Sequence, residues 1–258
     1  MQDPLTSRDR RRRKASVCTN WPMSMNETEY WNEVELLSAE VEDVIAIFYT
    51  YEEINRLAVE DHEIWETLQK EALFWNVQAY SLHTSLFIVL ARVFDSSGDA
   101  HSIHKLINAT LSNIHFFSKQ ALAKRKMAGG PKPEWLDDYV ARAWAPSAAR
   151  DLRHLKNSLR EYDRRFKKVY RPIRNKIFAH KAIADSQAVF ALFEKASHKE
   201  IAATLDFLHD LIEAICDLYL NGIKPELGQR SHGEGNRQIK RGAENVLRKL
   251  AKAGSPSA

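Results

Sequence analysis

From Glu27 to Ala58 the sequence reads ETEYWNEVELLSAEVEDVIAIFYTYEEINRLA, without a glycine or a proline. Its large apolar side chains recur at steps of three and four residues, which is typical of one buried stripe on a helix. The members of this stripe are Val34, Leu37, Val41, Val44, Ile45, Phe48 and Tyr51. The stretch therefore predicts a long amphipathic helix with one side in a core.

The same helical periodicity recurs along most of the chain. Further helices are expected over residues 62–94, from Ser102 to about Leu122, from Pro146 to Tyr170, and from Lys199 to Leu220. Ser102 and Ser197 suit N-caps, Pro172 suits the first turn of a new helix or a kink, and Asn221-Gly222 suits a C-terminal stop. The prediction is an all-α bundle of four to six long helices.

Composition excludes several classes of protein. No run of about 18 apolar residues exists, so no transmembrane helix and no membrane partner are expected. Two cysteines, Cys18 and Cys216, cannot make a disulfide framework. The glycine-rich phosphate loops and the G-x-S-x-G and H-E-x-x-H motifs are absent, and no metal or cofactor is predicted. A soluble, cytoplasmic protein is expected.

Charge divides the chain into three parts. Residues 1–22 read as a disordered basic leader, and translation starts at Met1, Met23 or Met25. Residues 23–228 form the helical domain, and residues 229–258, with seven Lys/Arg against two acids, form a basic amphipathic tail that is helical at least in part. Within the domain, residues 142–181 hold thirteen Lys/Arg against three acids. That cluster is either a solvated helical face or a phosphate-binding surface.

One segment in this basic region carries residues suited to phosphodiester cleavage, RPIRNKIFAHK from Arg171 to Lys181. The guanidinium of Arg174 can contact a phosphate, and the imidazole of His180 can accept or donate a proton near neutral pH. Asn175 can orient either group. Six residues on a helix turn through about 600°, so Arg174 and His180 point about 120° apart and would converge only across a two-fold axis.

Arg174-Asn175-x4-His180, placed before the final domain helix, resembles the signature of the HEPN superfamily of helical-bundle ribonucleases. RNKIFAHK together with LARVFD, from Leu90 to Asp95, is similar to the abortive-infection AbiU-like branch, over about residues 25–225. The resemblance implies a homodimer with one composite cleft and metal-independent cleavage of RNA to a 2′,3′-cyclic phosphate. It also implies a toxin with an antitoxin or defence-system partner. Some HEPN toxins carry a tyrosine two residues after the histidine, where this chain has Ala182, which puts control by modification there in doubt.

The resulting hypothesis assigns His180 as acid/base, Arg174 to the phosphate and Asn175 to their support. Six cations are expected to hold the RNA backbone: Arg164, Arg165, Lys167, Lys168, Arg171 and Lys181. Arg92 and Asp95 either brace the same cleft, or Arg92 only ties two helices together.

The same spacing, an arginine six positions before a histidine, occurs a second time at Arg56 and His62. This match lies among acids and is a poor site for RNA. The rival function is a non-catalytic helical module that binds RNA, a nucleotide or a partner protein.

Overall fold

The computed structural model describes residues 25–96, 101–175, 196–228 and 233–254. Throughout these ranges the regular structure is helical and includes no strand, which confirms the all-α prediction. Within the same ranges, none of the helices combines the length and the apolar character needed to cross a membrane. The predicted leader, residues 1–22, lies outside the described residues.

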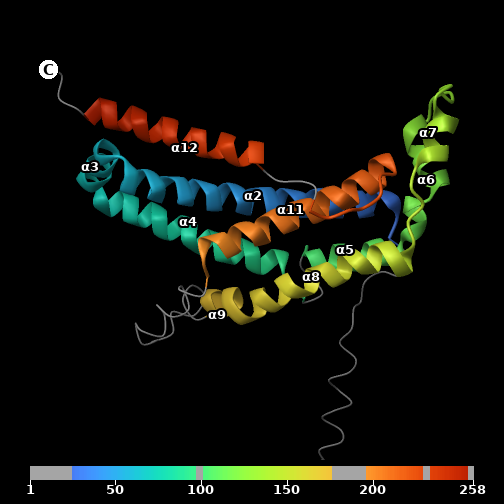
Figure 1. Ribbon diagram of the computed structural model, residues 1–258, viewed down its shortest axis with the longest axis horizontal. Helices are drawn as coiled ribbons and strands as arrows, with labels where there is room; N and C mark the ends of the chain where they lie inside the picture. Colours follow the sequence, from blue (N-terminus) through green and yellow to red (C-terminus); the bar gives the residue numbers. More distant parts are fainter. Residues whose placement is uncertain (1–24, 97–100, 176–195, 229–232, 255–258) are drawn as a thin grey trace, which may run out of the picture.

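Helix α2, Glu27–Glu60, is the central element, and α4, α11 and α12 all pack along it (Figure 1). Asn26 caps its start. Its side chain accepts a hydrogen bond from the backbone N–H of Glu29, and the Glu29 carboxylate accepts one from the backbone N–H of Asn26. The predicted apolar stripe is buried from Val34 to Phe48, with Leu37 and Phe48 fully inaccessible to solvent, and its last member, Tyr51, is partly buried. The helix ends at Asp61.

The segment predicted as a single helix over residues 62–94 is instead two helices. Asp61 caps α3, His62–Lys70, and Glu71 leaves helical geometry before α4, Ala72–Val93. Leu68 of α3 packs in a small cluster near the end of α2. Helix α4 contacts this cluster through Trp75 and the main core through Leu90.

The next segment is also shorter and more broken than its pattern suggests. Ser102 caps α5, Ile103–Ser112, as predicted. A turn of tighter helix, η1 (Ile114–Phe117), then leads to α6, Lys119–Met127, and after the Gly-Pro break to α7, Leu136–Arg142. Helices α6 and α7 form one end of the molecule (Figure 1).

A continuous helical rod follows, which we call the α8–α9 rod and which runs from residue 148 to residue 175. It contains a wide turn η2 (Ala148–Leu152), α8 (Arg153–Arg165), a second wide turn η3 (Phe166–Tyr170) and α9 (Arg171–Ile173). Pro172 lies in the first turn of α9, as predicted, and the chain is helical on both sides of it. Since Pro172 has no N–H to donate to the preceding turn, the widened turn just before it accommodates the ring.

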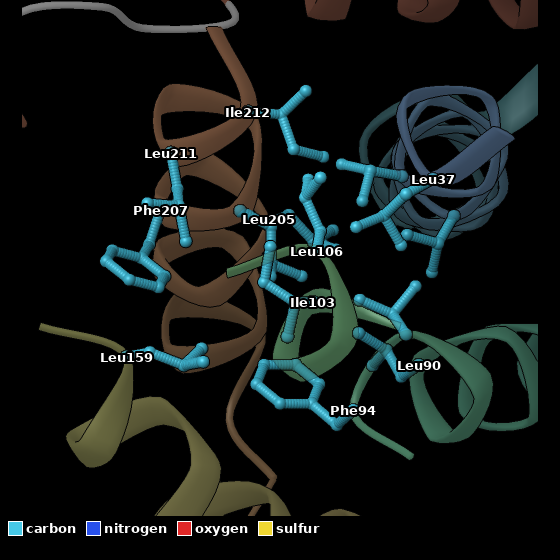
Figure 2. Packing of buried hydrophobic residues seen from close by; sticks show 14 of the residues in the cluster. Leu37, Leu90, Phe94, Ile103, Leu106, Leu159, Leu205, Phe207, Leu211 and Ile212 are labelled. Carbon is cyan, nitrogen blue, oxygen red and sulfur yellow. The ribbon is translucent and has the colours of Figure 1, made fainter. Parts of the chain in front are cut away.

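Helix α11, His198–Asn221, has twelve buried residues among its 24, compared with eleven among the 34 of α2. Ser197 caps its start, and Gly222 ends it in the left-handed region with φ of 63°, as predicted. In Figure 2 its side chains Leu205, Leu211 and Ile212 meet residues from α2, α4, α5 and α8 in one core. This core fixes the rod against the body of the domain.

The described part of the basic tail forms one helix, α12 (Gly233–Gly254), in agreement with the predicted amphipathic element. Leu247 and Ala251 are buried in the small cluster near the end of α2. Lys240 pairs with Glu52 at 2.7 Å, and Arg248 pairs with Asp61 at 2.9 Å. The described part of the tail is therefore packed on α2 and α3 rather than extended away from them (Figure 1).

Candidate nucleic-acid interface

The motif begins at the end of the α8–α9 rod, where the chain passes from a buried residue to an exposed one. Ile173 is fully buried, whereas the next side chain, Arg174, is exposed. The Arg174 Nη1 group donates a hydrogen bond to Oδ1 of Asn175 at 2.8 Å. The buried Ile173 fixes the backbone, and the amide of Asn175 holds the Arg174 guanidinium at the surface. His180 and Lys181 lie outside the described residues, and the angle of about 120° between Arg174 and His180 stays a prediction.

Exposed cations follow the rod from its start to the motif, and we call them the cationic row: Arg153, Arg160, Arg164, Lys168, Arg171 and Arg174. Successive members are three, four or seven residues apart, the spacing of neighbours along a helical face. At about 1.5 Å per residue the row is about 30 Å long. Among the described residues, no carboxylate forms an ion pair with any of them, so their charges face solvent.

Two of the cations predicted to hold RNA are engaged in ion pairs instead. Arg165 lies 3.5 Å from Glu200 of α11 and 3.9 Å from Glu161, and its side chain is 26% exposed. Lys167 pairs with Asp163 at 2.7 Å. The predicted set is thus divided: Arg164, Lys168 and Arg171 belong to the cationic row, and Arg165 and Lys167 have carboxylate partners on the rod or on α11.

Arg92, the candidate brace of the cleft, joins two helices. Its Nη2 lies 2.8 Å from Oε2 of Glu40, which links α4 to α2. The Asp95 backbone N–H donates to the Arg92 carbonyl at 3.1 Å, which closes the end of α4. These contacts describe helix packing, and the position of either residue relative to His180 lies outside the described part of the chain.

The second arginine and histidine with the same spacing, Arg56 and His62, are surrounded by carboxylates, whereas Arg174 lies at the end of the cationic row. Arg56 donates to both Glu53 and Glu60, and the hydrogen bond from Arg56 holds the pKa of Glu53 below its ordinary value. His62 lies 3.4 Å from Glu66. A guanidinium held by two carboxylates has little capacity left for a phosphate, so the contrast with Arg174 favours the latter as the RNA contact.

Sequence reasoning missed a cavity of about 190 Å³ close to the motif end of the rod, which we call the histidine pocket. It lies between α2, α4 and the start of α11, and its lining residues are Phe48, Tyr51, His83, Leu86, Ala196, His198 and Ile201. Burial, and to a lesser extent the charge of His198, lowers the pKa of His83. No pattern could have revealed the pocket, because its two histidines are far apart in the sequence.

A larger hollow, of about 640 Å³, lies around Trp144 at the other end of the rod. Arg150 and Lys224 stand 5.3 Å and 5.5 Å from the centre of the Trp144 ring. Both cations are paired, Arg150 with Asp151 at 2.9 Å and Lys224 with Glu226. The charges in this hollow balance, so it offers less attraction to a phosphate than the cationic row does.

Comparison with known proteins adds a family to this geometry. A search of curated proteins and a search of solved structures each find no match to the chain. The sequence profile of the HEPN family described as AbiU2 matches residues 28–242. That match includes the central helix, the α8–α9 rod, the Arg174 motif and the first part of α12. Because it covers most of the sequence, the chain belongs to the HEPN AbiU2 family.

Proposed function

We propose that this abortive-infection HEPN protein is a metal-independent endoribonuclease that acts as a toxin. The observation that carries the proposal is Arg174, an exposed guanidinium held by Asn175 at the end of a row of unpaired cations. A cationic row of this length suits the backbone of an RNA strand, because phosphate contacts provide affinity without reading sequence.

In the proposed reaction, the 2′-oxygen of a ribose attacks the adjacent phosphorus and the bond to the 5′-oxygen breaks. The products are a 2′,3′-cyclic phosphate and a free 5′-hydroxyl. Arg174 stabilises the charge that develops on the phosphate oxygens. An imidazole of His180 accepts the proton from the 2′-hydroxyl, and an imidazolium donates one to the departing 5′-oxygen. In the proposed homodimer, the two copies of His180 divide these two roles.

The test is incubation of purified protein with total RNA and with transfer RNA in EDTA, and analysis of the fragment ends. Wild-type protein is expected to give discrete fragments with 2′,3′-cyclic phosphate ends, and Arg174→Ala and His180→Ala are expected to give none. Arg56→Ala and His62→Ala are matched controls, because they make the same substitutions in the other arginine–histidine pair that is six positions apart. Cleavage that survives in His180→Ala, or is lost equally in His62→Ala, would contradict the assignment.

A second candidate is the non-catalytic module, with RNA as its ligand. It is favoured by one observation, that the cationic row is complete on the rod and needs no contribution from His180. A dimer that binds RNA with the affinity of a specific complex but leaves it intact would establish this function. Low expression of the wild type beside normal expression of His180→Ala would support the toxin, since a toxic nuclease limits its own host. The antitoxin or defence-system partner would then be sought by co-purification.

A further inference from the structure

We propose that the histidine pocket binds one nucleobase of the RNA strand whose phosphates lie on the cationic row. The inference rests on the proposed RNA-binding function and adds a base-recognition site beside the motif. It starts from two groups of observations: the chemistry and size of the pocket, and its connection to the end of the rod that carries Arg174.

The lining of the pocket has the character of a site for a planar heterocycle. Phe48, Leu86 and Ile201 provide apolar walls, and all three are buried. The rings of Tyr51 and His83 lie parallel, 5.3 Å apart at an interplanar angle of 7°. A neutral imidazole offers one donor and one acceptor, as the edges of the bases do. Aromatic walls with a few polar groups are the common means of holding an unstacked base.

His198 gives the pocket a second imidazole at its solvent side. It is the first residue of α11, its side chain is exposed, and its ring meets that of Tyr51 edge-on at 6.2 Å. Burial favours the neutral form of His83, and a charge on His198 favours it further. In the described residues no group of three His, Cys, Asp or Glu comes together as a metal site would require. Both imidazoles line the cavity, so the pair suits contact with the edge of a base.

The size of the pocket matches one base and no more. A protein cavity of about 150 Å³ accepts a benzene molecule, and the histidine pocket has about 190 Å³. Most pockets for whole cofactors or drug-sized ligands are larger, from about 300 Å³ upward. A free dinucleotide or a cofactor would not fit, whereas a base that leaves the stack of a single strand would.

The pocket is connected to the motif end of the rod by a short chain of ring contacts. His83 meets Phe87 at 5.1 Å, and Phe87 meets Tyr170 at 6.0 Å. Tyr170 precedes Arg174 by four residues, which is about one helical turn. On the other side of the pocket, Glu200 in the first turn of α11 pairs with Arg165 of the rod. A strand with phosphates on Arg171 and Arg174 therefore passes close to the pocket, which favours an RNA base over an unrelated small molecule.

The experiment measures how much one base adds to the binding of a backbone. The probe is a fluorescent 12-nucleotide strand with 2′-O-methyl sugars, which lack the attacking hydroxyl, so the full-length protein binds it without cleavage. One strand is wholly abasic, and the others carry a single adenine or uracil. With wild-type protein, one base is expected to strengthen binding by about ten- to hundred-fold, the usual effect of stacking one base on an aromatic platform.

Two variants address the pocket in independent ways. His83→Leu removes the inner imidazole, and Ala196→Leu fills the cavity from a residue that is 8% exposed. Both are expected to lose the gain from the single base while retaining the affinity for the abasic strand. His62→Leu is the control, because it makes the same histidine-to-leucine substitution on α3, at a side chain that is 79% exposed. Thermal melts monitored by circular dichroism show which variants are folded.

The results separate this inference from the proposed function. A base that adds nothing in wild-type protein, or a gain that persists in both folded pocket variants, would overturn the pocket assignment while leaving cleavage of natural RNA unaffected. A gain confined to proteins with an intact pocket supports it, even if the wild type cleaves no RNA and the nuclease proposal fails. Wild-type protein that binds neither strand would overturn both.

Discussion

Removal of three charges from the cationic row is expected to change how strongly salt weakens RNA binding. For single strands, the logarithm of the binding constant falls with the logarithm of salt concentration with a slope of about −0.7 per phosphate contact. If all six members of the row contact phosphates, the slope is about −4, and affinity falls about 300-fold between 50 mM and 200 mM salt. Replacement of Arg164, Lys168 and Arg171 by alanine halves the slope to about −2, so affinity falls only about 20-fold over the same range.

The control carries an equal change of net charge on another face of the molecule. Helix α12 and the α8–α9 rod lie on opposite sides of α2 (Figure 1). On α12, Arg241, Lys249 and Lys252 are exposed, and their replacement by alanine is expected to leave the slope near −4. Fluorescence anisotropy with a 2′-O-methyl strand at five salt concentrations measures both slopes. Equal slopes for the two triple variants would refute the row, because net charge rather than position would then govern binding.

Three further predictions concern the body of the domain. Leu247→Ala removes a side chain that is 2% exposed and is expected to cost about 2–5 kcal/mol in urea unfolding, whereas a loss below about 0.5 kcal/mol would mean that α12 does not share the core. Gly222→Ala is expected to cost at least about 2 kcal/mol, because φ is 63° and the new Cβ would lie 2.7 Å from Cβ of Ala143; an unchanged midpoint would contradict this. Burial lowers the pKa of His83 and of His104, so the folded protein binds fewer protons there than the unfolded chain does. Their contribution to stability is therefore full above about pH 6.5 and is lost as the pH falls; NMR titration showing either imidazole with a raised pKa would contradict it.

The sequence was sufficient to predict those parts of the fold that depend on local rules. The caps at Ser102 and Ser197 and the stop at Gly222 involve groups within a few residues of one another, so their patterns are complete in the sequence. The stripe of α2 was visible for the same reason. The break at Glu71 was not, because no glycine or proline marks it and no side chain caps the start of α4. The docking of α12 likewise depends on a cluster that residues of α2 and α3 build.

The candidate site shows the same division between local and distant information. Arg174 and Asn175 were found from their spacing and charge, and the acids around Arg56 already marked the weaker match. The ion pair of Arg165 could not be predicted from the sequence, because its partner Glu200 lies on another helix. The fold places the two charged groups 3.5 Å apart. The histidine pocket was invisible because no short motif contains its residues. Sequence patterns thus indicated the candidate groups of the site, whereas the structure was needed to show which of the predicted cations are paired with carboxylates.

The α8–α9 rod explains how one element can be both a structural support and the proposed RNA-binding surface. Its buried side consists of Leu155, Leu159, Phe166, Tyr170 and Ile173, each at most 5% exposed. Cations occupy the positions between them. Apolar anchors thus fix the backbone on both sides of the segment from which Arg160 and Arg164 extend, and again beside Lys168, Arg171 and Arg174. Because Ile173 is the last such anchor and Arg174 follows it directly, the guanidinium proposed to contact the phosphate is attached to the core by a single peptide unit. Any change that loosens this packing should thus reach RNA binding without touching a charged residue.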